Sequence, residues 1–497
     1  MRASGILMPV FSLPSRYGIG SFSKSAYQFV DMLKKAGQKY WQILPLCPTS
    51  YGDSPYQSFS TYAGNPYFID LDQLIEEKLL TRKECQACDF GDDPQDIDYG
   101  KLYENRFKLL RKAYERANVG EDQEFEAYRR ENAWWLDDYA LFMAVKDRFD
   151  GVAWSEWAED IRLRWSNAMD YYRRELYYEI EFYSYLQFVF MKQWKKLKNY
   201  ANINGIEIIG DIPIYVAFDS ADAWANPELF QFDSENLPTA VAGCPPDGFS
   251  ADGQLWGNPL YRWDYHRETG FDWWIRRIAY CSELYDVVRI DHFRGFDEYY
   301  SIPYGDTTAR NGHWEKGPGI ALFEAAKNRL GELNIIAEDL GYITDSVKKL
   351  VADSGFPGMK VLEFAFDSRE KSDYLPYTYE KNSVVYTGTH DNETIAGWYA
   401  GLDKSDLKMC TDYMNIDRIP GKEYHWDFIR LAMLSVSDLC VIPIQDYLGL
   451  DNRARINHPS TLGTNWRWRL AKGQLSASLL KEIREMTRIS GRLQNGE

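Results

Sequence analysis

The sequence contains few cysteines for its length of 497 residues. The seven cysteines are an odd number, so they cannot all pair within the chain, and they are too sparse for the disulfide framework of a small secreted domain. Cys85 and Cys88 have CxxC spacing, but neither a second pair nor a histidine cluster accompanies them, and we predict no zinc site. Reduced thiols are the simpler interpretation.

Long apolar segments and an excess of positive charge are also missing. No uninterrupted apolar run reaches the roughly 18 residues of a transmembrane helix, and Pro9 and Pro14 interrupt the apolar stretch near the start, unlike in a signal peptide. The net charge of −17 repels phosphate backbones and anionic membrane surfaces. We therefore expect a cytoplasmic protein whose partners include neither nucleic acid nor membrane.

Aromatic residues, by contrast, are abundant, with 36 Tyr, 17 Trp and 25 Phe. With so many rings, a number of them must lie at or near the surface of the protein. The rings of Tyr and Trp combine a flat apolar face with a polar edge, which suits stacking on sugar rings. Most individual rings are still expected to pack in the core. The composition thus favours a carbohydrate ligand without indicating which rings bind it.

Short apolar and β-branched runs recur along the chain, separated mostly by stretches of helical periodicity. This alternation predicts strand, helix, strand, repeated, and eight buried runs favour a (β/α)8 barrel. A doubly wound open sheet is the alternative, but no GxGxxG follows any predicted strand. The eight runs are 5–11, 40–46, 206–216, 286–293, 334–341, 359–366, 383–392 and 439–449.

The spacing of these runs is uneven, which predicts insertions. Residues 67–199 are rich in Tyr, Trp, Lys and Glu at helical spacing, so we expect a mostly helical subdomain between the second and third strands. Residues 1–66 and 200–497 would form the catalytic barrel. Residues 217–274 follow the third strand and are rich in Gly, Pro, Asp and Asn, which predicts a long, ordered active-site loop or subdomain within the barrel.

Polar residues end several of the predicted strands, where a (β/α)8 barrel places its active site. Arg289 and Asp291 are two residues apart and share one side of the fourth strand. Glu338 ends the fifth strand and Asp391 the seventh, while Asp211 lies in the third. Carboxylates from separate strands can therefore converge on one pocket.

Such a set fits glycoside chemistry with retention of configuration. One ionised carboxylate attacks the sugar C1, and one protonated carboxyl about 5 to 5.5 Å away donates to the leaving oxygen. Arg289 would keep Asp291 ionised, whereas apolar neighbours would raise the pKa of Glu338. We predict Asp291 as nucleophile and Glu338 as acid/base. Asp391 would hold sugar hydroxyls and help distort the ring, with His390 and His292 as neutral hydrogen-bond donors.

Each of these segments also has a structural interpretation. Arg289 and Asp291 could be a structural ion pair, Glu338 and Asp339 a helix N-terminal pair, and residues 390–392 a turn. Three such segments at the ends of correctly ordered strands favour the catalytic interpretation.

Seven ordered segments resemble the 4-α-glucanotransferases (amylomaltases, or disproportionating enzymes), of the family 77 glycoside hydrolase type. They are YGDSPYQSFSTYAGNPYFIDL, IGDIPIYVA, PPDGFSADGQLWGNPLY, VVRIDHFRGF, IIAEDLG, YTGTHDNET and NWRWR. The resemblance runs nearly end to end, and it implies transfer of an α-1,4-glucan segment between maltooligosaccharides. It departs at Ser460, where the family usually shows Gly, and at Gly248, where a larger residue is more usual.

By this resemblance, Asp291, Glu338 and Asp391 match the family's nucleophile, general acid/base and transition-state stabiliser. Other matching positions would line the donor and acceptor subsites: Arg289, His390, Asp211, Tyr56, Trp256, Asp247, Gln254, His292, Asn392 and Asn465. A secondary glucan site would involve Tyr51 or Tyr99. No metal cluster or nucleotide loop is evident, so we predict no cofactor.

The carboxylates alone do not distinguish transfer from hydrolysis, because both use the same set. An aromatic acceptor platform that excludes water would favour transfer, and Phe249, Trp256, Tyr261, Tyr51 and Tyr56 could form it. The alternatives are an α-amylase-type hydrolase and a non-catalytic glucan-binding protein on a decayed barrel.

Overall fold

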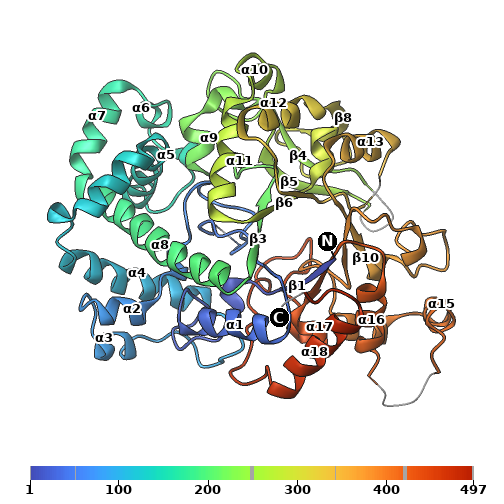
Figure 1. Cartoon of the computed structure of the whole chain (residues 1–497). Helices are drawn as coiled ribbons and strands as arrows, with labels where there is room; N and C mark the ends of the chain where they lie inside the picture. The colour runs from blue at the N-terminus through green and yellow to red at the C-terminus, as the bar shows by residue number, and fades with distance from the viewer. Residues whose placement is uncertain (1, 51, 247–250, 342, 418–422, 495–497) are drawn as a thin grey trace.

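The structure is a computed structural model of the chain, and it describes residues 2–50, 52–246, 251–341, 343–417 and 423–494. Eight parallel strands close into a barrel, and each is hydrogen-bonded to the barrel strands that precede and follow it in sequence (Figure 1). All eight predicted runs contribute a strand. The strands are β1 (Ala3–Leu7), β2 (Tyr40–Gln42), β3 (Glu207–Pro213), β6 (Val287–Asp291), β9 (Ile335–Ala337), β10 (Gly358–Val361), β11 (Ser383–Tyr386) and β12 (Leu439–Pro443).

Helices follow the strands and pack around the barrel, as the alternating sequence pattern predicts. In α1 the buried residues Ala26, Phe29, Val30 and Leu33 recur at helical spacing and form one apolar face. Local signals set the helix ends, since Thr344 caps the start of α13 and Gly355 ends it with a φ of 74°. The barrel helices include α1 (Lys24–Lys35), α11 (Asp272–Leu284), α12 (Ile320–Leu330), α13 (Asp345–Ser354), α14 (Ile395–Gly401), α15 (Lys404–Met414), α16 (His425–Leu434), α17 (Ile444–Tyr447) and α18 (Ala477–Ile489).

The predicted helical insertion lies between β2 and β3, at one side of the barrel (Figure 1). Its two longest helices, α5 and α8, pack along each other, and the rings of Phe125 and Phe188 contact across them. Among the described residues, no helix combines the length and apolar character needed to span a bilayer. The insertion comprises α2 (Leu71–Glu76), α3 (Arg82–Gln86), α4 (Tyr99–Arg116), α5 (Gln123–Arg148), α6 (Glu159–Arg162), α7 (Ser166–Glu175) and α8 (Tyr177–Ile203).

The region after β3 is more regular than the predicted loop. It contains α9 (Ala221–Ala225), α10 (Trp263–Glu268) and two strands, β4 (Ala240–Cys244) and β5 (Gln254–Pro259). These strands join β7 (Glu298–Pro303) and β8 (His313–Lys316) in an antiparallel sheet of order β5-β4-β7-β8. Half of this sheet comes from residues after β6, so the pairing of its strands cannot be predicted from residues 217–274 alone.

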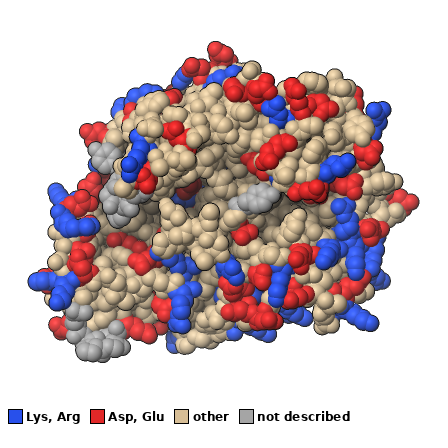
Figure 2. Space-filling view, turned by 180° about the vertical axis from the view of Figure 1, so that it is seen from behind, with Lys and Arg blue, Asp and Glu red and all other residues tan. Residues whose placement is uncertain are grey.

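In Figure 2 positive and negative side chains intermingle around a hollow near the centre of the face shown.

Candidate active site

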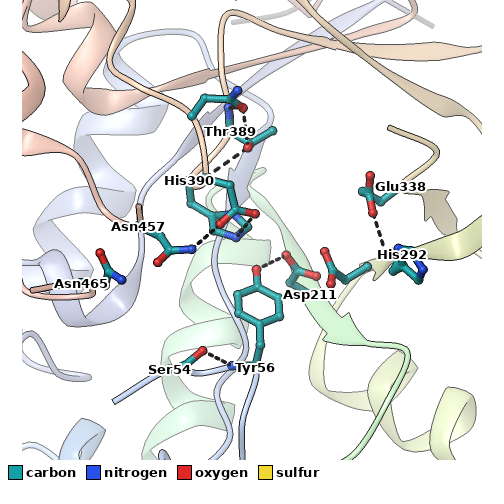
Figure 3. A network of polar contacts seen from close by, with 12 residues as sticks. Ser54, Tyr56, Asp211, His292, Glu338, Thr389, His390, Asn457 and Asn465 are labelled. Carbon is teal, nitrogen blue, oxygen red and sulfur yellow. Dashed lines mark hydrogen bonds and ion pairs between the residues drawn. The ribbon is translucent and has the colours of Figure 1, made fainter. Parts of the chain in front are cut away.

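The predicted site residues meet at the carboxyl ends of the barrel strands. Asp211 lies in β3 and Asp291 ends β6, whereas Glu338 directly follows β9. His390 and Asp391 lie four and five residues beyond the end of β11. Figure 3 shows Asp211, Glu338 and His390 around one space, approached from separate strands. The closed parallel barrel is what brings residues so far apart in sequence together.

Arg289 organises the floor of this site. Its Nη1 donates to both carboxylate oxygens of Asp211, at 2.8 and 2.7 Å, and its Nη2 lies 3.1 Å from Oδ1 of Asp291. Asp211 faces Arg289 because the two residues are paired in register across β3 and β6. The hydroxyl of Tyr56 donates to Asp211 Oδ2 at 2.9 Å. Asp211 thus neutralises the buried guanidinium of Arg289. The side chain of Asp291, by contrast, is 28% exposed.

The two carboxyls proposed for the chemistry differ in their electrostatics. Burial and the neighbouring charge of Asp291 raise the pKa of Glu338 to about 7, although Arg289 and two backbone amides oppose this shift. Those amides, of His292 and Leu340, donate to Glu338 at 2.6 and 2.9 Å. Of the two carboxyls, Glu338 therefore keeps its proton to the higher pH.

The pKa of Asp291 shifts in the direction opposite to the one expected from its neighbour Arg289. Burial raises the pKa of Asp291 to about 6, because desolvation outweighs the attraction of Arg289. Sequence could show the adjacent arginine but not that the arginine is already shared with Asp211. Asp291 still ionises before Glu338, so near neutrality the pair carries one carboxylate and one carboxyl.

Asp391 is held in its ionised form. Desolvation in the cleft would raise the pKa of Asp391, but His390 and Asn457 together hold it well below its usual range. His390 Nε2 lies 3.2 Å from Asp391 Oδ2, and Asn457 Nδ2 donates to Oδ1 at 2.7 Å (Figure 3). A permanent negative charge at this place suits hydrogen bonding to sugar hydroxyls and stabilisation of a cationic transition state.

The two histidines of the site differ from each other. Burial and the nearby charge of Arg294 lower the pKa of His292 to about 3, so this ring is neutral, as expected. Burial also disfavours the charged form of His390, but Asp391 more than compensates and raises its pKa. This direction is opposite to the neutral state expected for His390. The difference arises because the adjacent carboxylate accepts a hydrogen bond from the ring.

Sequence reasoning missed the segment that braces Asp391. Arg455 donates to the backbone oxygens of Asp391 and Asn457, each at 2.7 Å, and the amide of Asn457 donates to His390 O. These contacts fix residues 455–457 against the segment after β11. Asn457 lies inside the string RINHPSTLGTNW, but no spacing rule shows that its side chain reaches Asp391.

Aromatic rings flank the carboxylates on two sides. The ring of Tyr56 stacks on His390 at a centroid distance of 5.1 Å and an angle of 12°. Trp256 contacts His292 edge to face at 4.9 Å, and its Nε1 donates to Gln254 Oε1 at 3.0 Å. Trp256 therefore extends the site from the side of β5. Gln254 serves it as a hydrogen-bond partner.

Several other predicted residues make mostly local contacts. Asn392 accepts from the amide and hydroxyl of Thr389 at 2.9 and 2.7 Å, so this segment is also the turn considered above. Asn465 binds the backbone of His458 and Thr461 and holds its own loop. The hydroxyl of Tyr99 donates to the backbone oxygen of Trp466 at 2.7 Å. Asp247 and Tyr51 lie outside the described residues, as do Gly248 and Phe249 of the predicted platform.

Comparison with known proteins gives the site its context. The sequence profile of a family described as 4-alpha-glucanotransferase matches residues 8–475. This chain belongs to the 4-alpha-glucanotransferase family. The relative from Clostridium butyricum is 49% identical over 487 residues, which cover 98% of this chain and 100% of that protein. The relative from Streptococcus pneumoniae serotype 4 is also 49% identical, over 99% of this chain and 98% of its own length.

Solved structures agree with this placement in the 4-alpha-glucanotransferase family. An amylomaltase from Streptococcus agalactiae, solved in complex with acarbose, has a TM-score of 0.96 and 44% identity, and the match covers 99% of this chain and 100% of that one. An amylomaltase from Corynebacterium glutamicum has a TM-score of 0.78 at 19% identity, a match that concerns the fold alone. The chain is thus an enzyme of the glucanotransferase type with the predicted barrel.

Ser460, where the resemblance noted above leads us to expect glycine, adopts a backbone conformation that favours glycine. Its φ is 65°, in the left-handed region that a side chain makes costly. The loop nevertheless closes with Ser460 in place, because Thr461 donates to His458 O at 2.6 Å and Asn465 bridges the two. These contacts hold the loop in a conformation that glycine would adopt at less cost than serine.

Proposed function

We propose that this glucanotransferase cleaves an α-1,4 bond in a maltooligosaccharide and transfers the glucosyl or maltosyl segment to the 4-OH of another glucan. The observation that carries the proposal is the convergence of Asp291, Glu338 and Asp391 at or just beyond the carboxyl ends of β6, β9 and β11 in the closed barrel. A retaining transfer needs one carboxylate and one carboxyl at the same time. Family membership supports the choice of an α-glucan as substrate.

The reaction would proceed by two displacements. Asp291 Oδ attacks C1 of the donor sugar, while Glu338 gives its proton to the glycosidic oxygen, which leaves as the new hydroxyl of the released fragment. Asp291 then carries the glycosyl group as an ester. In the second step Glu338, now ionised, takes the proton from the acceptor 4-OH as that oxygen attacks C1 and Asp291 departs. Two inversions retain the α configuration.

The surrounding residues would stabilise the charge that develops on the sugar. Asp391, held ionised by His390 and Asn457, would accept hydrogen bonds from hydroxyls and stabilise an oxocarbenium-like ring. His292 and Tyr56 would contact the sugar from opposite sides. Arg289 would orient Asp291 through the contact at 3.1 Å.

Transfer competes with hydrolysis for the same intermediate. We assign the preference for transfer to an acceptor platform around Trp256, because a bound sugar occupies the place from which water would attack. Tyr261, which was predicted to belong to this platform, is buried and cannot stack on an acceptor sugar. It is 1% exposed, and its hydroxyl donates to Ile214 O. Of the described rings predicted for the platform, Tyr56 and Trp256 contact histidines of the site.

Incubation of the pure protein with maltotriose, followed by separation of the products, tests the proposal. Glucose together with oligosaccharides longer than maltotriose is the expected result. Progressive conversion to glucose and maltose alone would make the protein a hydrolase, and binding without turnover would leave only the glucan-binding alternative.

The remaining assignments extend this proposal. We place the catalytic barrel at residues 1–66 and 200–497, and the helical insertion at 67–199. The substrate contacts of Asp247, Gln254, Asn392 and Asn465, the secondary glucan site at Tyr51 and Tyr99, and a cytoplasmic location remain predictions.

A further inference from the structure

A group of buried carboxyls lies beneath the segment that carries His390 and Asp391. Glu363 lies just after β10, in the 3-10 turn Leu362–Phe364, and is 8% exposed. Its backbone amide donates to Thr387 O at 3.2 Å. A Cβ placed on Gly388 would come 2.6 Å from Glu363 Oε1, so the carboxyl lies directly against the Gly388 backbone.

A second buried carboxyl, Asp446 of α17, holds both ends of the same segment. Its Oδ2 accepts from the Thr387 hydroxyl at 2.5 Å, and its Oδ1 accepts from the Ile395 amide at 2.8 Å. These two contacts bracket residues 388–394, which include His390 and Asp391. Asp446 is only 1% exposed.

The hydrogen bonds indicate which of the two carboxyls carries the charge. Asp446 accepts two hydrogen bonds, as a carboxylate does, whereas Glu363 Oε1 has no hydrogen-bond partner among the described residues. An ionised oxygen without a partner at such depth is costly, and two adjacent buried carboxylates are costlier still. Burial and then the charges of Asp446 and Glu393 raise the pKa of Glu363, and Arg455 and the backbone amide of Glu393 oppose them only in part. Burial also raises the pKa of Asp446, to about 6, and its hydrogen bonds from Thr387 and Ile395 oppose that shift.

We propose that Glu363 is a positioning residue that keeps its proton, and that this neutral carboxyl and the Asp446 carboxylate together fix the segment carrying His390 and Asp391. This inference rests on the proposed function, because it acts through Asp391. Ionisation of Glu363 would place its charge beside Asp446 of α17 and Glu393 of the loop before α14, with Arg455 after the turn Asn452–Ala454 as the facing cation. The repulsion would push the segment away from the sugar.

Two substitutions of Glu363 test whether a neutral side chain of the same size is enough to position the segment that carries Asp391. Glu363→Gln keeps a neutral side chain of the same size, whereas Glu363→Ala leaves a cavity under Gly388. We expect Ala to lower kcat for maltotriose transfer by about 10²-fold through misplacement of Asp391, with little change in KM, and we expect Gln to recover most of that loss. Ile483→Ala, a cavity in the buried face of α18, is the control for loss of stability alone.

A double-mutant cycle shows whether the effect passes through Asp391. In an Asp391→Asn background, Glu363→Ala should cost far less than in the wild type. Additive losses, wild-type kcat in the Ala variant, or equal damage by Gln and Ala would each overturn the inference. Failure of the proposed function would look different, because the unmodified protein itself would then form no longer oligosaccharides.

Stability against pH gives a readout independent of turnover. A carboxyl whose folded pKa is raised contributes stability at low pH, and the contribution is lost as pH rises through the folded pKa. The Tm of the Glu363→Gln variant minus the Tm of the wild type should therefore increase as pH increases. A difference in Tm that stays constant with pH would contradict a proton held on Glu363.

Discussion

At the scale of single residues, the site depends on how a few charges share one arginine. Arg289 binds Asp211 through Nη1 and contacts Asp291 through Nη2. Burial nevertheless raises the pKa of Asp291 to about 6 and that of Glu338 to about 7. A more strongly acidic Asp291 would be a poorer nucleophile and a better leaving group. Asp291 must act as both in turn in the proposed double displacement.

This order of pKa values predicts the pH dependence of the reaction. Ionisation of Asp291 activates the enzyme as pH rises, and loss of the proton from Glu338 inactivates it at higher pH. We expect a bell-shaped profile of kcat/KM for maltotriose with its maximum between about 6 and 7, the apparent values belonging to the pair. A rate that is highest well above pH 9 would contradict the assignment of Glu338 as acid.

Asn457 offers a second test at this scale. Asn457→Ala removes the hydrogen bond to Asp391 Oδ1, which is a bond to a charged group worth about 1.5–3 kcal/mol. If that bond is realised mainly in the transition state, kcat/KM falls by about 10- to 100-fold. Asn202→Ala is the comparison, since Asn202 likewise donates to a carboxylate, that of Asp286, but just before the start of β6 and without contacting Asp391. Equal rates for the wild type and Asn457→Ala would remove Asn457 from the site.

At the scale of elements, close packing behind β3 keeps Asp211 in place. A Cβ on Gly210 would come 2.1 Å from the ring of Tyr285, so Gly210→Ala must displace a buried aromatic ring. Overpacking of this kind typically costs about 1–3 kcal/mol, and we expect a lower Tm in thermal unfolding. Gly401→Ala is the matched control, because a Cβ at Gly401 meets open space. A Gly210→Ala variant as stable as this control would show that the ring moves freely.

The small sheet offers a test of the acceptor platform. Trp256 lies on β5 and contacts His292, so Trp256→Ala should weaken acceptor binding more than donor cleavage. The expected outcome is a higher ratio of free glucose release to transfer products from maltotriose, measured by product separation. The closest available control is Trp314→Ala on β8 of the same sheet, whose ring contacts Tyr300 and Arg294. An unchanged ratio in Trp256→Ala would place the platform elsewhere.

At the scale of the whole molecule, the barrel and its helical insertion were predictable because strand and helix periodicities are local signals. All eight runs became barrel strands, and the ends of those strands located Asp291, Glu338 and Asp391. The sheet β5-β4-β7-β8 was not predictable, since its strands come from either side of β6. For the same reason Asn457 and Glu363 were missed: each acts through a contact made only by the folded chain.

The proposed mechanism depends on a glycosyl ester at Asp291. Glu338→Gln removes the acid that releases the first fragment and the base that activates the acceptor, but an α-glucosyl fluoride donor needs no protonation to leave. We therefore expect Glu338→Gln to accumulate a glucosyl-enzyme with this donor. Peptide mass spectrometry should find one added glucosyl residue on the peptide containing Asp291, and none in Glu338→Gln combined with Asp291→Asn. A label on another residue, or none at all while the wild type transfers from this donor, would contradict the account.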